Sequence, residues 1–97
     1  MIQVKRLEIV VDAPFSELVT EVLERHAVEG WTVVRGAAGS GERGAQLGDE
    51  ITGVSNNHVI MTTCSPDRLD ALVADMRPLL KRYGGICLVS DAAWIDH

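Results

Sequence analysis

The sequence predicts a single α+β domain whose elements follow the order β-α-β-β-α-β. Three observations lead to this prediction. Four short runs are rich in β-branched residues, two longer segments repeat apolar residues at helical spacing, and a long glycine-rich segment separates the second strand from the third. A chain of 97 residues has room for one small domain with a thin core, so we expect oligomerisation to add stability.

The first predicted strand covers residues 1–11. Leu7, Ile9 and Val11 alternate along it with a second set of side chains, so one face of this strand should be fully buried. The second set mixes apolar and charged residues: Val4, Arg6, Glu8 and Val10. That face is too mixed for a core and too apolar for a plain surface, so we expect another subunit to cover it.

The first predicted helix follows directly and extends to about residue 28. Asp12 or Ala13 caps it, and Pro14 suits the first turn, where a missing N–H costs nothing. Gly30 is expected to end the helix. Residues 31–35 are dense in β-branched and aromatic side chains, which predicts the second strand.

The second half of the chain begins with a third predicted strand over residues 58–64. Ser65 then caps a helix that we expect Pro78 to bend and that closes with Lys81 and Arg82. A glycine pair turns the chain into a fourth strand over residues 86–90. A short tail, 92–97, remains, and we expect fraying among the polar residues near the chain end: Asp91, Asp96 and His97.

This order is the ferredoxin-like, split βαβ sandwich, in which two helices cover one face of a four-stranded antiparallel sheet. Strands one and three should form the central pair, with strands two and four at the edges. Residues 1–97 should form one domain, with a loop at about residues 37–57.

The loop is the main indication of function, because six of the nine glycines lie between Gly36 and Asn57 and most connections span only about 4–6 residues. Residues 39–44 match G-x-G-x-x-G, but no helical stripe follows, and Glu42 and Arg43 replace the lysine and hydroxyl of a P-loop. Two interpretations remain: backbone N–H groups that bind an anion together with Arg43, or a flexible turn.

A second place suited to an anion lies at Lys81 and Arg82, just before Gly84 and Gly85. The alternative is a helix end whose cations merely favour the helix dipole. If edge strands of neighbouring subunits meet, the two weak anion sites could form one cleft.

Charge and composition exclude several classes of protein. A net charge of −5 and a pI near 5.0 argue against a nucleic-acid binder, and an RNA-recognition module would need aromatic residues on strands one and three. No signal peptide occurs, nor any apolar segment near the roughly 20 residues that span a bilayer. We therefore expect a reduced, cytoplasmic protein.

Neither a metal site nor a catalytic site is expected. Cys64, Cys87 and His58 lack metal-binding spacing, and isolated cysteines in apolar runs are usually buried. His26 continues the apolar stripe of the first helix and should mark its edge. Ser40 and Ser55 have no positioned base, so the chain is not expected to be an enzyme.

The segments GWTVVRGAAGSGERG and MRPLLKRYGGICLVSDAAW, together with the pair Asn56-Asn57, resemble the PII signal-transduction superfamily. The likeness is greatest to its PII-like branch associated with carboxysomes and bicarbonate transport, and it covers nearly the whole chain. It implies a homotrimer that holds an adenine nucleotide between subunits. It also implies that the long loop, the T-loop of this family, reports occupancy of that site to a protein partner.

The resemblance also implies which residues bind ligands. The phosphates would meet the T-loop base at Gly39, Ser40, Gly41 and Arg43, and the base and ribose would lie by Thr62, Thr63 and Cys64. The phosphate-binding B-loop corresponds to Lys81, Arg82, Gly84 and Gly85, followed by Ile86 and Cys87. A bicarbonate ion would lie near Arg43, Asn56 and Asn57.

Departures from the family pattern refine these expectations. Gly85 replaces the B-loop lysine and no Lys or Arg follows Arg82, which should favour AMP or ADP over ATP. The T-loop has no tyrosine, so tyrosyl uridylylation is not expected. The partner would act in carbon uptake or fixation, for example as a bicarbonate transporter, and only it would bring this chain to a membrane. Alternatives on the same fold are an acyl-phosphate hydrolase, although its glycine-valine-glutamine-glycine loop is missing, or a metal-binding relative.

Overall fold

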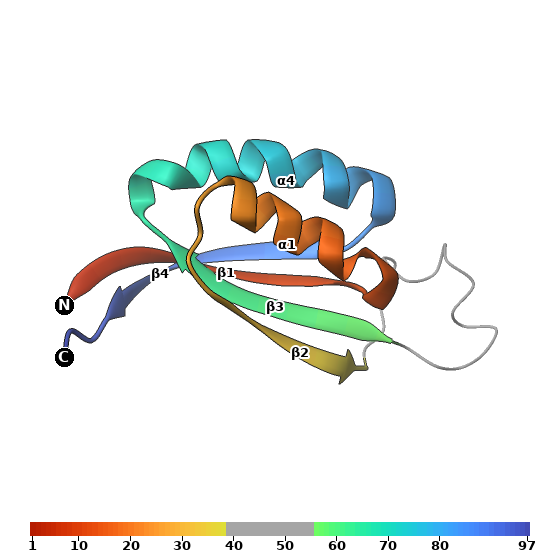
Figure 1. The fold of residues 1–97 in the computed structure, drawn as a ribbon, viewed down its shortest axis with the longest axis horizontal. Coiled ribbons are helices and arrows are strands. Elements are labelled where there is room, and N and C mark those ends of the chain that lie inside the picture. The colour runs from red at the N-terminus through yellow and green to blue at the C-terminus, as the bar shows by residue number, and fades with distance from the viewer. Residues whose placement is uncertain (39–55) are drawn as a thin grey trace.

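A computed structural model describes residues 1–38 and 56–97, and it confirms the order β-α-β-β-α-β (Figure 1). The six main elements are β1 (Ile2–Asp12), α1 (Ser16–Arg25), β2 (Trp31–Ala37), β3 (Asn57–Cys64), α4 (Leu69–Tyr83) and β4 (Ile86–Trp94). A short 3-10 turn leads into each helix, at Ala13–Phe15 and at Pro66–Arg68, and each turn carries a proline at its start.

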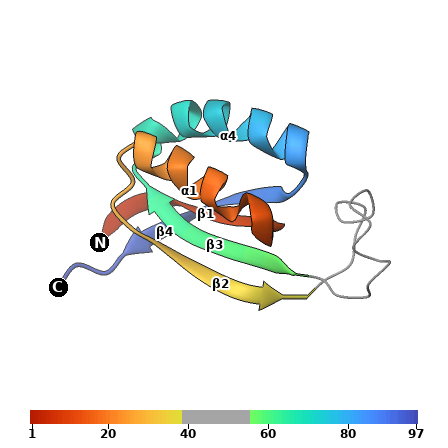
Figure 2. The same ribbon diagram turned by 45° about the vertical axis from the view of Figure 1, so that its right-hand side comes forward.

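The four strands form one antiparallel sheet in the order β2-β3-β1-β4, so the predicted central pair, β1 and β3, is confirmed. The register places Ile9 of β1 between Ile60 of β3 and Cys87 of β4. Figures 1 and 2 show both helices on the same face of this sheet. Among the described residues, no element covers the opposite face.

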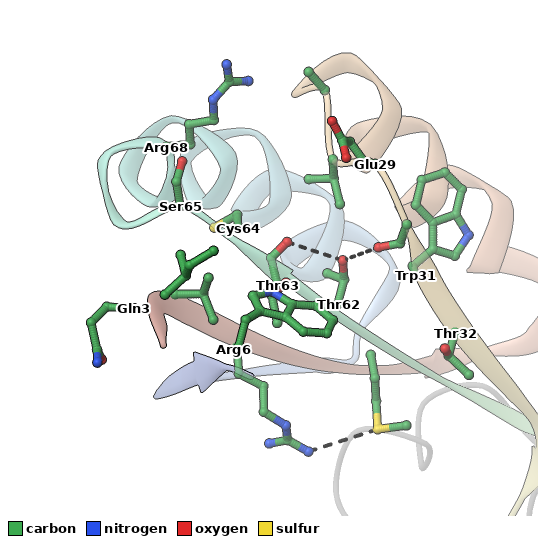
Figure 3. A pocket seen from close by; sticks show the side chains of 17 residues that line it. Gln3, Arg6, Glu29, Trp31, Thr32, Thr62, Thr63, Cys64, Ser65 and Arg68 are labelled. Atoms are coloured by element: carbon green, nitrogen blue, oxygen red, sulfur yellow. Dashed lines mark hydrogen bonds between the residues drawn. The ribbon is translucent and has the colours of Figure 1, made fainter. Parts of the chain in front are cut away.

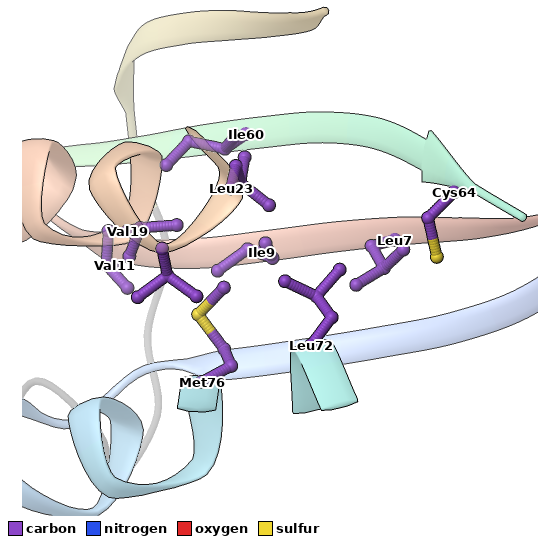
Figure 4. Close-up of a cluster of buried hydrophobic side chains, with 10 residues drawn as sticks. Leu7, Ile9, Val11, Val19, Leu23, Ile60, Cys64, Leu72 and Met76 are labelled. Atoms are coloured by element: carbon purple, nitrogen blue, oxygen red, sulfur yellow. The ribbon is translucent and has the colours of Figure 1, made fainter. Parts of the chain in front are cut away.

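The core lies between the helices and the sheet (Figure 4). Leu7, Ile9 and Val11 of β1 are buried there, as their alternation predicted. Their partners come from both helices and from the neighbouring strand: Val19, Val22 and Leu23 of α1, Leu72 and Met76 of α4, and Ile60 and Cys64 of β3. Each fully buried aliphatic side chain of this kind contributes about 1.5–3 kcal/mol, so this single cluster accounts for the cohesion of the sandwich.

The uncovered face carries the other set of side chains, because successive residues of a strand point to opposite faces. Val34, Ile86 and Leu88 on this face are 46%, 47% and 57% exposed. Arg6 and Glu8 lie among them, and the Arg6 guanidinium is 3.6 Å from the Glu8 carboxylate. The mixed character predicted for β1 therefore extends across the sheet.

The end of α1 differs from the prediction. The helix stops at Arg25 rather than near Val28, and the stop is made by Ala27, whose φ of +57° lies in the left-handed region. The N–H of Ala27 donates to Glu24 O at 3.0 Å and that of Val28 to Leu23 O at 3.0 Å, which is a Schellman motif. Gly30, expected to end the helix, follows in the connection to β2.

The end of the chain also differs from the prediction. β4 extends to Trp94 instead of stopping at Ser90, because residues 91–94 pair with residues 2–5 of β1. The Lys5 ammonium pairs with the Asp91 carboxylate across these strands. The expected fraying of Asp91 is therefore wrong, and its strand lengthens the sheet at the end where the two termini meet. Asp96 follows and lies 3.3 Å from the N-terminal ammonium.

The unusual backbone at Ala27 leads to a stability prediction. The left-handed region costs an L-residue about 1–2 kcal/mol relative to glycine, partly offset by the greater freedom of glycine in the unfolded chain. Ala27→Gly should therefore raise the free energy of unfolding by about 0.5–1 kcal/mol.

Ala74→Gly is the matched control, because Ala74 is an exposed residue inside α4. It should lower the free energy of unfolding by about 1 kcal/mol. Urea titrations of both variants at one protein concentration test the pair. Equal destabilisation by the two substitutions would contradict a left-handed cap at Ala27.

Candidate functional site

The root of the predicted T-loop is held by Asn57. This residue is 3% exposed, and its Nδ2 donates to Ala37 O at 3.2 Å, which joins the end of β2 to the start of β3. The backbone N–H of Ala13 donates to Asn56 O at 2.9 Å. Asn57 thus has a structural task at the loop root, whereas Asn56 is exposed.

The phosphate residues predicted within the loop, namely Gly39, Ser40, Gly41 and Arg43, lie outside the described residues. Gly36, just before that segment, has φ +72° and lies where the register between β2 and β3 shifts. The described part of β2 is therefore irregular at the point where the loop begins.

An open groove of about 880 Å³ lies at the other end of the sheet (Figure 3). Three groups of residues line it: residues 2–4 and Arg6 of β1 with Trp94, residues 27–32 between α1 and β2, and residues 61–65 with Arg68 at the end of β3. In Figure 3, Thr62 and Thr63 lie at its centre, between Trp31 and Ser65. Its volume is in the range of small-molecule sites.

The three residues expected beside the base and ribose play different parts in this groove. Thr62 is buried, and its hydroxyl donates to Gly30 O at 2.6 Å, which fixes the turn before β2. Cys64 packs into the hydrophobic core. Thr63 points to the uncovered face of the sheet, and its Oγ1 accepts a hydrogen bond from Trp94 Nε1 at 3.1 Å. Of the three, Thr63 lies on the open side of the sheet.

Two side chains fix the helical wall above the groove. Arg68 donates to the carbonyl of His26 at 3.1 Å and so satisfies a carbonyl at the end of α1. The Nε2 of His26 lies 2.7 Å from Asp75 Oδ2 on α4. His26 therefore joins the two helices at the edge of the apolar layer, where its spacing placed it.

The second predicted site lies at the end of α4. Lys81 and Arg82 are exposed there, and the Arg82 guanidinium lies 5.3 Å from the centre of the Tyr83 ring. Tyr83 also stacks on Phe15, with ring centroids 4.6 Å apart. The two cations of this site therefore lie next to the stacked rings of Phe15 and Tyr83.

The glycine pair after these cations is required by the backbone. Gly84 has φ +79° and Gly85 has φ +117°. A Cβ on Gly85 would lie 2.7 Å from Val10 O and 2.9 Å from Val11 Cγ1, both on the neighbouring strand β1. Gly85 is therefore fixed by a close approach between backbones, whether or not a ligand binds here.

The register places these two sites at opposite ends of the sheet. Cys64 pairs with Lys5 at one end of β1, whereas β4 begins at Ile86, opposite Val10. The structure thus brings Thr62, Thr63 and Cys64 together at the groove and keeps Lys81, Arg82, Gly84 and Gly85 together away from it. Ile86 and Cys87 continue from the second group into β4.

Several groove residues were not anticipated from the sequence: Arg6, Trp31, Thr32, Arg68 and Trp94. Arg6 was assigned only to the mixed face of the first strand, and Trp94 to the tail. The sequence carries no local signal for Trp94, because residues 86–94 (ICLVSDAAW) do not alternate between apolar and polar side chains.

The cysteines and histidines do not gather into a metal site in the part of the chain that the structure describes, since no three His, Cys, Asp or Glu side chains there are placed to hold an ion. Burial raises the pKa of the Cys64 thiol, with a further contribution from the Asp67 charge, and burial raises the pKa of Cys87. Both thiols are therefore protonated at neutral pH. Over residues 1–38 and 56–97, no helix is long and apolar enough to span a membrane.

The family of this chain follows from comparison with known protein families. The family model for nitrogen regulatory protein P-II matches residues 4–96. This chain belongs to the P-II family. The match confirms the resemblance noted in the sequence, whereas a comparison with curated proteins finds no sequence match.

Solved structures of P-II proteins share the fold. CPII from Thiomonas intermedia K12, bound to ADP, AMP and bicarbonate, is 22% identical, with a TM-score of 0.82 over 98% of this chain and 96% of that one. A PII-like signalling protein from Thermus thermophilus is 17% identical, with a TM-score of 0.72 over 94% and 87% of the two chains. The ATP complex of B. subtilis GlnK is 20% identical, with a TM-score of 0.68 over 95% and 84%.

The close approach at Gly85 gives a prediction for this P-II chain. Gly85→Ala would place a methyl group against the β1 backbone at a positive φ, so it should lower the free energy of unfolding by about 2–4 kcal/mol. Gly30→Ala is the matched control, since its Cβ would meet open space, and it should change stability by less than about 0.5 kcal/mol. Chemical denaturation measures both. A tolerated Gly85→Ala would show that β1 and the start of β4 do not approach as described.

Proposed function

We propose that this P-II chain is a non-enzymatic sensor. In this proposal it binds an adenine nucleotide, AMP or ADP in preference to ATP, in clefts between the subunits of a homotrimer. Two structural relatives support the ligand class, since CPII was solved with ADP and AMP and B. subtilis GlnK with ATP. The observation that carries the proposal is the separation of the two candidate sites to opposite ends of one sheet.

This separation favours a site built from two copies of the chain. Thr63 of the groove pairs with Arg6 of β1, whereas Gly85 approaches Val10 of the same strand. The distance along β1 between these two positions is about 13 Å. The two sites also lie on either side of β1, because β3 and β4 are about 10 Å apart. A nucleotide that contacts both the groove and the end of α4 is therefore best held when the groove of one copy faces the α4 end of another.

The uncovered face of the sheet provides a surface for such an assembly. Val34, Ile86 and Leu88 are exposed on it, and the half-buried Val10 and Val59 lie between them in the register. A contiguous apolar row of this kind, on a face that also carries Arg6 and Glu8, is typical of a subunit interface. Burial of these side chains would supply the stability that a small core lacks.

The charges at the end of α4 support the proposed preference among nucleotides. Lys81 and Arg82 are the cations available beside the glycine pair, and no Lys or Arg follows them in the chain. Each phosphate group added to the nucleotide would need further charge-assisted donors. Two cations, together with the proposed phosphate contacts of the T-loop base (Gly39, Ser40, Gly41 and Arg43), suit AMP or ADP better than ATP.

We extend the proposal to bicarbonate, which CPII was solved with. Arg43 and the exposed Asn56 are its proposed donors, whereas the Asn57 amide already donates to Ala37 O at the loop root. Ligand binding would order the T-loop and so alter the surface offered to a protein partner. We propose a cytoplasmic role with a partner in the uptake or fixation of inorganic carbon, through which any membrane contact would occur.

Calorimetric titration with AMP, ADP and ATP, each with and without bicarbonate, tests this function directly. Light scattering on the same sample gives the oligomeric state. We expect a trimer that binds AMP or ADP more tightly than ATP. A monomer, or a protein that binds none of the three nucleotides, would reject the proposal.

The placement of the phosphates gives a second test. Arg82→Ala and Arg43→Ala should each weaken binding of ADP by about 1.5–3 kcal/mol, the contribution of a hydrogen bond to a charged group. Arg77→Ala is the matched control, because Arg77 is an exposed arginine of the same helix one turn before Lys81, and it should leave the affinity unchanged. Equal affinities in all three variants would show that the phosphates lie elsewhere.

A further inference from the structure

Trp94 has a defined position in the groove. It is the last residue of β4, and its indole Nε1–H donates to Thr63 Oγ1 at 3.1 Å. The bond joins two strands that do not pair with each other, because β1 lies between β3 and β4 in the sheet. The indole therefore reaches across the whole width of β1.

The register shows which residue the indole crosses. Trp94 pairs with Ile2 and Thr63 pairs with Arg6, and Val4 lies between these two positions on the same face of β1. Val4 is only 9% exposed although no helix covers that face. The hydrogen bond to Thr63 directs the indole across β1 at the level of Val4, which agrees with the burial of Val4.

Trp94 nevertheless keeps an exposed surface. Trp94 is 55% exposed, while its position is fixed at one end by strand pairing and at the other by the bond to Thr63. The second tryptophan of the groove differs, since Trp31 packs against the hydrophobic core. Around the open indole, the groove offers Arg6, Thr32 and Ser65 as polar side chains. A rigid, exposed aromatic plane with polar groups beside it suits a flat heteroaromatic ring.

We propose that Trp94 is the platform on which the purine base of the bound nucleotide stacks. This inference rests on the proposed function and adds the residue that recognises the base. A base has two apolar faces and a polar edge, so it can cover the open indole while its edge meets the side chains of the groove. The phosphates would then point away from the groove, toward the α4 end of a neighbouring copy.

Fluorescence and calorimetry together test the stacking. ADP should quench tryptophan emission of the wild-type protein, because a stacked base contacts the indole directly. Trp94→Phe should bind ADP with an affinity within about tenfold of wild type but lose most of this quenching, because the remaining tryptophan, Trp31, packs against the hydrophobic core. Trp94→Ala should bind ADP about 5- to 150-fold more weakly, which corresponds to about 1–3 kcal/mol.

The outcomes separate this inference from the proposed function. If wild type and Trp94→Ala bind ADP equally, or if Trp94→Phe keeps the full quenching, the stacking role is wrong while nucleotide binding stands. A third outcome is that Trp94→Ala changes the oligomeric state, while tryptophan emission of the wild-type protein responds to dilution but not to ADP. Trp94 would then be an interface residue, and the inference fails. Absence of ADP binding by the wild-type protein would instead reject the proposed function itself.

Discussion

The pairing of β1 with both of its neighbours is the constraint on which the rest of this structure depends. Because β1 pairs with β3 on one side and β4 on the other, its register decides which residues face the core and which face the open side. Leu7, Ile9 and Val11 enter the core, and Val4, Arg6 and Val10 are left on the other face. A shift of one residue would exchange these two sets and remove the centre of the hydrophobic cluster.

The same strand also places the functional regions. At its C-terminal end Asp12 lies opposite Asn57, which holds the loop root, and Val10 is the backbone that Gly85 approaches. At its N-terminal end Lys5 lies opposite Cys64, beside the groove. One strand therefore keeps two sets of ligand-binding candidates apart, and this distance is why the proposed nucleotide site requires a second copy of the chain.

Much of the fold could be predicted because its signals are local. The alternation of Leu7, Ile9 and Val11 and the apolar stripe of α4 follow from the periods of strands and helices, and both predictions are confirmed. The end of α1 could not be predicted in this way. Gly30 was the stronger stop signal, but Val28 returns to the core and so the chain turns earlier, at an alanine held in a left-handed backbone. The extra length of β4 depends on pairing with residues more than 80 positions earlier, which no local pattern reports.

The sequence by itself determined the element order, the buried face of β1, the P-II resemblance and the cations that end α4, because each of these depends on residue type and spacing. Only the tertiary structure decided that Thr62 and Cys64 point inward while Thr63 points outward, and that Trp94 lies across β1 rather than in a tail. The physical reason is that a site is assembled by strand register over long separations in the chain. Residue spacing along a strand indicates which of its side chains share a face, whereas the register decides which residues of neighbouring strands lie side by side.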